Sequence, residues 1–372
     1  MKVGILKEIK TKENRVAMTP SGVEEMIENG HSVQVETKAG TGSGFSDRQY
    51  ENSGAEIVGS AQEIYAQSDM VMKVKEPLPV EYPLIRSGQI LFTYFHFAAS
   101  EELTNAVMKS GCIAVAYETV EKANGSLPLL TPMSEVAGRM AIHEGSKYLE
   151  KTYGGKGILL CGVPGVEPGT VIVLGGGTVG INAAKMACGM GAKVYLLDTN
   201  IDRLRYLSDV MPNNCFPIMS NSSTLRRLLP EADLVIGAVL IHGSAAPKMI
   251  TKDMLKYMRK GSVIVDVAID QGGCVETARA TTHDDPIFEV DGIIHYCVAN
   301  MPGAVSMTST LALTNATLPY AVELANKGYK LAAQENPELA KGINIIAGKV
   351  TFKGVAEAFN LDYTPLDSIL KK

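Results

Sequence analysis

Short runs of β-favouring apolar residues alternate with amphipathic segments through the first third of the chain. Thr19, Ser60 and Ser100 stand where N-cap residues would start three of these segments as helices. Strands that alternate with helices predict a mostly parallel sheet covered on both faces. We expect helices at residues 22–28, 61–67 and 101–109, and strands at residues 2–6, 31–36, 56–58, 70–74, 89–95 and 112–117.

A glycine motif follows the next apolar strand, expected at 171–174. Gly175, Gly177 and Gly180 have the spacing G-x-G-x-x-G and precede an Ala-rich helical stretch. Gly175 permits a tight turn, Gly177 lets a pyrophosphate approach the backbone, and Gly180 lets helix and strand pack closely. Because a second strand ending at Asp198 follows in register, the motif predicts a dinucleotide site rather than a turn that binds nothing.

Asp198 lies 23 residues after Gly175. A carboxylate near this spacing binds the adenosine ribose and would repel a 2′-phosphate, so NAD is favoured over NADP. Arg203 and Arg205, a few residues further on, keep NADP as the alternative.

The apolar pattern predicts two domains. A polar turn at 122–126 marks a boundary, and a long helix at 308–326 would return the chain to the first domain, because the tail beyond it lacks the composition of a third core. We expect an α/β fold of two Rossmann-like domains with mostly parallel sheets and a cleft between them. The substrate domain would be residues 1–128 completed by 307–372, and the NAD-binding domain residues 129–306. Within these we also expect helices at 134–151 and 251–258, a hairpin at 153–169, and strands at 193–197, 233–239, 262–267 and 292–298.

Composition narrows the partners. The chain of 372 residues has 46% hydrophobic and 20% charged residues and a net charge of −5, as in ordinary α/β proteins, and it lacks a basic run, so we expect no nucleic acid. It lacks an apolar stretch of membrane-spanning length and opens in a strand rather than a signal peptide, so we expect no membrane. The six scattered cysteines favour reduced core thiols and a cytoplasmic location.

Four ionisable residues come where strands are expected to end, and ligands collect at the carboxyl ends of parallel strands. Arg15 offers a planar fork for a substrate carboxylate. Lys75 could polarise a carbonyl or stabilise an alkoxide. His96 suits proton exchange with that oxygen, and Asp270 could position ammonia or water.

Each of these residues also has a structural interpretation. Arg15 and Lys75 could be solvated charges, His96 a satisfied histidine between two phenylalanines, and Asp270 the cap of the next turn. Glu118 could bind a cation, but a lone carboxylate is weak evidence for one. The other histidines lack metal-ligand spacing, so we expect no metal. The four charged residues together, beside a predicted nicotinamide-binding domain, support an active site more strongly than any one of them does alone.

Several longer motifs carry a family resemblance. Residues 4–20 and 171–194 match two signatures of the family that comprises alanine dehydrogenase and the NAD-binding subunit of proton-translocating transhydrogenase. The segments KVKEP, FTYFHFA, LTPMSEVAGRMA, VDVAIDQGG and NMPGAV also resemble this family, so the likeness covers essentially the whole chain. Leu6 and Ser306 depart from it, since proline is common at both positions, but neither is a proposed reacting group.

The resemblance to alanine dehydrogenase implies reversible conversion of L-alanine, NAD⁺ and water to pyruvate, NADH and ammonium by a homohexamer. It implies that Arg15 and Lys75 bind pyruvate and that His96 and Asp270 are the catalytic pair. The residues that it places at the NAD site are Ser134, Gly175, Gly177, Thr178, Val179, Gly180, Asp198, Arg203, Ser220, Val239, Asn300 and Met301.

Three other functions stay open. A transhydrogenase component would pass hydride to a nucleotide on another subunit and needs no carboxylate-binding arginine beside a catalytic histidine. A non-catalytic NAD sensor could keep the fold without the reaction. Another amino-acid or opine dehydrogenase could use the same scaffold with a bulkier substrate.

Overall fold

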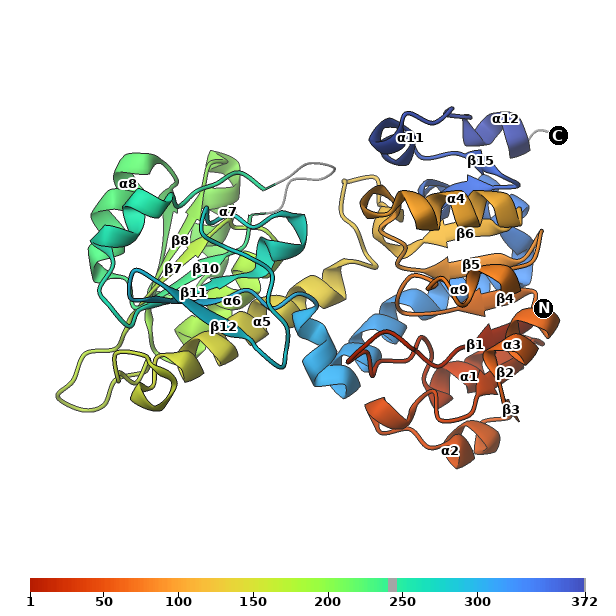
Figure 1. Ribbon diagram of the computed structural model, residues 1–372, viewed down its shortest axis with the longest axis horizontal. Helices are drawn as coiled ribbons and strands as arrows, with labels where there is room; N and C mark the ends of the chain where they lie inside the picture. Colours follow the sequence, from red (N-terminus) through yellow and green to blue (C-terminus); the bar gives the residue numbers. More distant parts are fainter. Residues whose placement is uncertain (240–245, 371–372) are drawn as a thin grey trace. The chain divides into compact units, whose positions relative to one another are not determined.

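Two compact α/β units make up the part of the chain that the computed structural model describes, residues 1–239 and 246–370. One unit comprises Met1–Met133 with Gly303–Lys372, and the other comprises Ser134–Pro302. In Figure 1 the blue C-terminal segment belongs to the same unit as the red and orange N-terminal third. The expected fold class, two Rossmann-like units with mostly parallel sheets, is confirmed, whereas the functional roles expected of the two domains stay predictions.

Eight strands form the sheet of the first unit. Their spatial order is β15 (Lys349–Val350), β14 (Ile343–Ile346), β6 (Ile113–Ala116), β5 (Ile90–Thr93), β4 (Met70–Met72), β1 (Lys2–Ile5), β2 (Ser32–Glu36) and β3 (Glu56–Val58). Strands β1 to β6 pair in parallel, and β14 pairs antiparallel with β6. The central strands β4, β5 and β6 are buried along their whole length, as in a sheet covered on both faces.

The helices of this unit begin largely where the sequence predicts. Thr19, Ser60 and Ser100 each accept a hydrogen bond from a backbone N–H of the first turn, so all three predicted N-caps are confirmed. The helices are α1 (Pro20–Glu28), α2 (Asp47–Asn52), α3 (Ala61–Gln67), α4 (Glu101–Ser110), α9 (Ser306–Glu335), α10 (Pro337–Gly342), α11 (Lys353–Phe359) and α12 (Leu366–Leu370). Short 3-10 turns are η1 (Thr41–Ser43), η2 (Tyr82–Leu84), η3 (Phe97–Ala99) and η4 (Tyr117–Thr119).

The second unit contains a seven-stranded sheet. Its spatial order is β12 (Ile287–Val290), β13 (Ile293–Tyr296), β11 (Val263–Asp266), β10 (Leu234–Gly237), β7 (Thr170–Leu174), β8 (Lys193–Asp198) and β9 (Cys215–Met219). The chain builds outward from β7 on one side and then resumes at β10 on the other, so the strand order reverses between β7 and β10. Ligands of doubly wound sheets bind at such a switch point, outside the carboxyl ends of the strands.

Helices and turns connect these strands. The α-helices are α5 (Thr131–Tyr148), which contains the boundary between the units, α6 (Thr178–Gly189), α7 (Ile201–Val210) and α8 (Ser222–Leu228). The 3-10 turns are η5 (Lys151–Tyr153), η6 (Leu229–Glu231), η7 (Lys252–Tyr257), η8 (Val267–Gln271) and η9 (Met301–Val305).

Three expected elements differ from the structure. The hairpin expected at 153–169 is an irregular loop in which only an isolated bridge joins Val163 and Val166. The helix expected at 251–258 is the 3-10 turn η7, and the helix expected at 308–326 continues to Glu335 across a kink at Gly328. The positive φ of 69° at Gly328 explains how one apolar helical pattern accommodates the change of direction.

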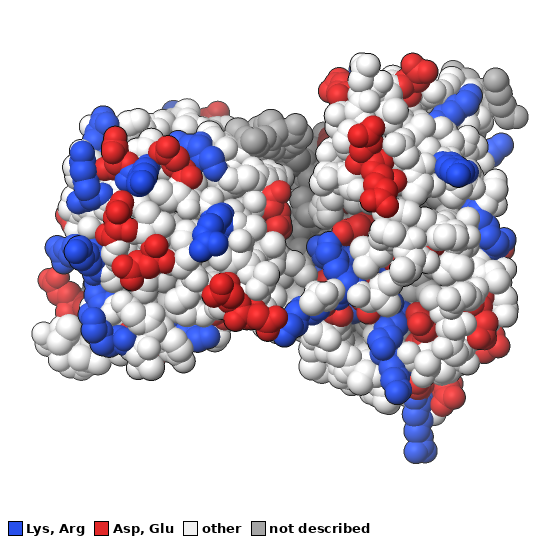
Figure 2. Space-filling model, in the orientation of Figure 1, with Lys and Arg blue, Asp and Glu red and all other residues white. Residues whose placement is uncertain are grey.

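The surface and the cysteines agree with the composition. Acidic and basic side chains are interspersed on the face shown in Figure 2. No helix within residues 1–239 and 246–370 has the combined length and hydrophobicity that crossing a membrane requires. All six cysteines are free of disulfide bonds, and five of them are buried, so all but the exposed Cys161 lie in the core as expected.

Candidate functional site

The glycine loop, residues 175–180, lies at the switch point of the second sheet. Gly175 has a φ of 96°, which L side chains rarely adopt, and a Cβ on Gly180 would come within 1.8 Å of the Gly175 carbonyl oxygen. Gly177 caps helix α6, and a Cβ on it would meet no atom within 4 Å. The loop therefore combines a tight turn, close helix packing and open space before the N-terminus of a 12-residue helix, as a bound pyrophosphate requires.

Asp198 ends β8 beside this loop. Its Oδ2 accepts the backbone N–H of Gly176 at 2.8 Å, and its Oδ1 accepts that of Asn200, also at 2.8 Å. Arg203 donates from Nε to the Gly176 carbonyl at 2.6 Å, and its guanidinium lies over the Tyr206 ring. The carboxylate is thus fixed next to the second glycine, where the ribose of a dinucleotide binds in this type of fold.

The side chain of Ser220 is a second feature consistent with a bound ligand. Its Oγ is buried without a hydrogen-bond partner, while its backbone N–H donates to the Asp198 carbonyl at 2.9 Å. A buried hydroxyl with no partner costs free energy that a bound ligand would recover. The donors and space around the glycine loop therefore fit a dinucleotide.

The other predicted cofactor residues also belong to the second unit. Thr178 and Val179 form the first turn of α6, and the Cα of Val239 lies 3.2 Å from the position of a Cβ on Gly175. Ser134 lies in α5, Asn300 has a φ of 60°, and Met301 is buried at the start of η9.

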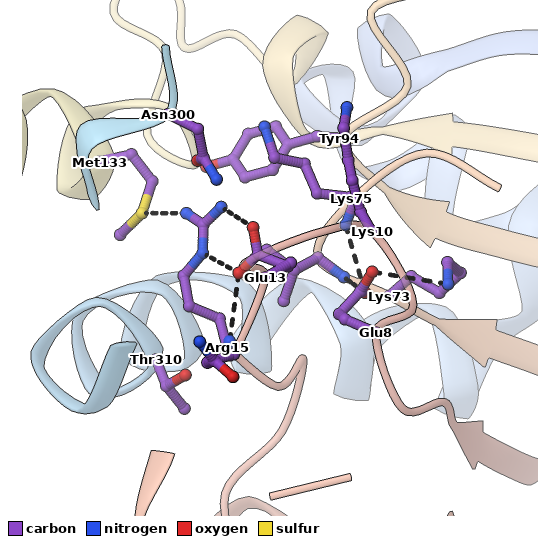
Figure 3. Close-up of polar contacts among 12 residues, drawn as sticks. Glu8, Lys10, Glu13, Arg15, Lys73, Lys75, Tyr94, Met133, Asn300 and Thr310 are labelled. Carbon is purple, nitrogen blue, oxygen red and sulfur yellow. Dashed lines mark hydrogen bonds and ion pairs between the residues drawn. The ribbon is translucent and has the colours of Figure 1, made fainter. Parts of the chain in front are cut away.

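Arg15 lies in the first unit, in the loop after β1, and is only 2% exposed. Its Nε and Nη2 donate to the two carboxylate oxygens of Glu13 at 2.7 and 2.6 Å, and its Nη1 donates to the Met133 sulfur at 3.1 Å (Figure 3). Burial alone would lower the pKa of the guanidinium, but the hydrogen bonds and charge of Glu13 raise it above its ordinary value. The Arg15 guanidinium is therefore charged and fixed in position: its Nε and Nη2 bind the Glu13 carboxylate, and its Nη1 contacts the Met133 sulfur, a weak acceptor.

Lys75 follows β4 and is half-buried near Arg15. The carboxylate of Glu8 accepts the backbone N–H groups of Val74 and Lys75 at 2.6 and 3.3 Å and lies 3.6 Å from Lys73 Nζ. Burial, and after it the charge of Arg15, lowers the pKa of Lys75. Within the described chain the Lys75 ammonium has no hydrogen-bond or ion-pair partner, so it can bind an oxygen of a small ligand.

His96 follows β5 and is exposed. Its ring stacks on Tyr94, with centroids 5.8 Å apart and an interplanar angle of 9°. Burial raises the pKa of the Tyr94 hydroxyl, and the charge of Arg15 opposes that shift. The structure thus brings Arg15, Lys75 and His96 to the carboxyl ends of neighbouring parallel strands of one sheet, in the same unit.

Asp270 belongs to the second unit and does not end a strand as predicted. Strand β11 ends at Asp266, and Asp270 lies four residues later, exposed, in η8. Asp266 is fully buried, and its oxygens accept the backbone N–H groups of Ala268, Cys274 and Val275 at 3.1, 2.8 and 3.0 Å. Burial raises the pKa of Asp266, although these hydrogen bonds lower it. Asp266 therefore fixes the turn that carries Asp270.

The sequence pattern did not predict which carboxylates hold these groups. Glu8 and Glu13 lie in the matched segment 4–20 and Asp266 lies in VDVAIDQGG, but neither segment indicated a supporting role, and only the position of Glu13 two residues before Arg15 gave a local signal. Glu118, which as a lone carboxylate was weak evidence for a cation site, instead accepts backbone N–H groups. No group of three or more potential metal-ligating side chains occurs among the described residues.

Comparison with known proteins extends these observations to both units. Two family models match, "Alanine dehydrogenase/PNT, N-terminal domain" over residues 4–137 and "Alanine dehydrogenase/PNT, C-terminal domain" over residues 141–353. Alanine dehydrogenases of Methanococcus maripaludis and Geobacillus stearothermophilus are 56% and 54% identical, over the full length of each chain. A solved L-alanine dehydrogenase superposes with a TM-score of 0.94 at 51% identity, covering 97% of this chain and 99% of that one.

Proposed function

We propose how this chain works from one premise: it belongs to the alanine dehydrogenase/PNT family. It is a nicotinamide-dependent amino-acid dehydrogenase with alanine dehydrogenase function. The observation that carries the proposal is the pair of cations, Arg15 and Lys75, near each other at the strand ends of the first sheet. A 2-oxo acid presents a carboxylate and a carbonyl oxygen, and these are the two groups that such a pair can bind.

The cofactor is NAD rather than NADP. Asp198 places a fixed negative charge beside Gly176, where a 2′-phosphate would be repelled and a ribose hydroxyl would be bound. Arg203, which supported the alternative, donates its Nε to the loop backbone, and Arg205 is exposed and paired with Asp202. Both arginines thus have other partners.

Substrate binding follows from the geometry of the first unit. Glu13 holds the Nε edge of Arg15, so the Nη1 side of the fork binds the substrate carboxylate in place of the Met133 sulfur. The Lys75 ammonium binds the oxygen that interconverts between carbonyl and hydroxyl. Its lowered pKa makes it a stronger hydrogen-bond donor to that oxygen as negative charge develops.

The reaction converts L-alanine and water to pyruvate and ammonium, with release of one proton and reduction of the cofactor. When bound, the nicotinamide cofactor would supply the acceptor for the hydride that leaves the alanine Cα. His96 takes the proton from the hydroxyl of the carbinolamine that forms when water adds to iminopyruvate, while Lys75 holds the oxygen. Asp270 assists the departure of ammonia.

The activity has a direct test. The purified chain, with no other protein present, should form NADH from NAD and L-alanine, measured by NADH absorbance. Binding of NAD without alanine-dependent NADH would favour the non-catalytic sensor, and activity that requires a second nucleotide-binding protein would favour the transhydrogenase component. A panel of bulkier 2-oxo acids with ammonium tests the opine-type alternative.

The catalytic assignment has a separate test. His96→Ala and Asp270→Asn should each lower turnover by roughly 100-fold or more, since general acid–base catalysis contributes that much. Because the chain lacks tryptophan, NADH emission can report cofactor binding by both variants against a low background. Near-normal turnover in both would contradict the assignment.

Assembly and location are also proposals. A homohexamer is expected by family membership, and light scattering of the purified chain tests it by mass. A reducing compartment, the cytoplasm, suits six unpaired thiols of which five are buried. Fractionation of cells that express the chain tests the location.

A further inference from the structure

The backbone of His96 adopts a conformation that few residues other than glycine adopt. Its φ is 51° and its ψ is 42°, in the left-handed region, immediately before η3. An L residue with a Cβ is strained there, and such strain persists only where neighbouring groups hold the backbone. The position of the imidazole therefore depends on what binds this turn.

A carboxylate from the neighbouring strand binds it. Glu118 lies in η4, just after β6, and β6 pairs in parallel with β5 so that Thr93 and Ala116 are in register. Because the segments that follow β5 and β6 leave the sheet side by side, the Glu118 side chain reaches the turn that carries His96. Its Oε1 accepts the His96 N–H at 2.5 Å, and its two oxygens accept the Phe95 N–H at 3.2 and 3.3 Å.

The ring of His96 is held by a second contact. Tyr94 is 3% exposed, its hydroxyl donates to the Leu129 carbonyl at 2.5 Å, and its ring stacks on the imidazole. The stack defines the plane of the imidazole, but the backbone of the turn decides where along Tyr94 it lies. Hydrogen bonds from N–H groups to an ionised carboxylate are stronger than neutral ones, so Glu118 is the main support of the backbone.

We propose that Glu118 is a positioning residue for the alanine dehydrogenase reaction: it fixes the left-handed turn at His96 and thereby places the imidazole at the substrate oxygen. This inference rests on the proposed role of His96 in proton transfer. The Glu118 oxygens accept backbone N–H groups, so the carboxylate supports this turn rather than a cation. Glu118 touches no reacting atom and acts only through His96.

Kinetics of three variants test the inference. Glu118→Ala should lower kcat about 10- to 100-fold, because a catalytic group displaced by about 1 Å can lose that much. The KM for alanine should change less than about 3-fold, since Arg15 and Lys75 bind the substrate. Glu118→Gln keeps an acceptor oxygen and should recover most of kcat. Glu121→Ala, a control that removes a nearby carboxylate paired with Lys341, should leave kcat unchanged.

A double-mutant cycle separates positioning from other roles. Once His96 is replaced by alanine, adding Glu118→Ala should lower kcat no further, because nothing is left to position. A further loss of about 10-fold or more in that background would overturn the inference, as would normal kcat in Glu118→Ala. Normal turnover of His96→Ala itself would instead refute the proposed proton transfer, and the inference with it. NADH binding by the second unit and thermal unfolding show whether each variant is folded. If Glu118→Ala does not fold, Glu118→Asp replaces it in the cycle, and its kcat is expected to lie between those of Glu118→Gln and His96→Ala.

Discussion

The glycine loop of the second unit and the cation pair of the first, Arg15 and Lys75, both lie at the carboxyl ends of parallel strands but are built differently. The loop consists of backbone turns and glycines within six consecutive residues, and its supporting carboxylate, Asp198, ends the next strand. Arg15 is a buried charge paired with Glu13, and Lys75 is a half-buried charge whose backbone N–H donates to Glu8, 67 residues away in the sequence. A site made of backbone is specified by a short motif, whereas a site made of buried charges is specified by distant residues.

The difference has an energetic cause. A backbone turn needs only the absence of side chains at the right positions, and glycine provides that locally. A buried charge needs a partner, because removing it from water costs several kcal/mol. The partner can lie in the same loop, as Glu13 does for Arg15, or come from another strand that ends nearby, so sequence spacing alone does not identify it.

The largest effect is expected from filling the glycine loop. Gly180→Ala would place a Cβ 1.8 Å from the Gly175 carbonyl oxygen, on backbone atoms that cannot move aside, so we expect a loss of at least about 4 kcal/mol of stability and no cofactor binding. Gly177→Ala meets no atom within 4 Å and should fold normally, yet bind NADH about 10-fold more weakly, because the methyl group occupies the approach of the pyrophosphate. Thermal unfolding and NADH emission measure both. Equal effects at the two positions would contradict the geometry.

The next effect concerns the buried ion pair of Glu13 and Arg15. Glu13→Leu leaves the guanidinium without its carboxylate partner, and we expect a loss of about 3 kcal/mol in the free energy of unfolding. Adding Arg15→Met removes the guanidinium charge that Glu13 no longer balances. The double variant should therefore recover part of the lost stability, but it should have no activity. Denaturant unfolding of the single and double variants measures the difference. A double variant less stable than Glu13→Leu alone would show that the charge is not what destabilises it.

These two regions also show what the sequence could predict. The strands, the three N-caps and the glycine loop follow from local patterns, and all were confirmed, with strand ends usually within one or two residues. Strands β9, β12, β14 and β15 were missed. Strand β14 pairs antiparallel with β6, more than 200 residues away, and β15 and β12 are short edge strands. Strand β9 is an edge strand interrupted by Pro217, which is unusual within a strand.

The strand end at Asp266 illustrates a different limit. The strand was expected at 262–267, with Asp270 at the end of the apolar run VIVDVAID, but the chain turns at Asp266, because this buried carboxylate accepts the Ala268 N–H two residues on. Burial on both sides of the turn keeps the apolar pattern continuous, so the pattern alone does not mark the end of the strand. The candidate functional residues could therefore be proposed from residue type and position, whereas the residues that support them could not.

A smaller effect is expected in the pH dependence of the cation pair. The pKa of Lys75 is lowered by burial and then by Arg15, so in the folded chain the ammonium loses its proton below the ordinary value of 10.5. Between the folded pKa and 10.5 the unfolded chain still binds this proton, so the contribution of Lys75 to stability rises with pH there. Activity should fall in the same window, because the charge proposed to bind the substrate oxygen is lost. The pH profile of kcat/KM for pyruvate measures this alkaline limb.

Two neighbouring charges sharpen the pH prediction. Lys10 lowers the pKa of Lys75, and Glu76 raises it. Lys10→Ala should therefore move the alkaline limb to higher pH, and Glu76→Gln should move it to lower pH. Shifts in the same direction would assign the limb to another group.

The smallest effect is expected beside the glycine loop, where we propose that Asp198 selects NAD over NADP. Asp198→Ser removes the charge that would repel a 2′-phosphate but keeps a hydroxyl, so the preference for NAD over NADP should fall by about 10-fold, which is about 1.4 kcal/mol. Arg205→Ala, the control, removes an exposed ion pair with Asp202 and should change neither this preference nor stability by more than about 0.5 kcal/mol. Ratios of kcat/KM for the two cofactors measure both variants. If Arg205→Ala changes the preference more than Asp198→Ser does, exposed arginines rather than the fixed carboxylate recognise the adenosine ribose. Residues outside the glycine motif and its following strand would then determine the choice of cofactor.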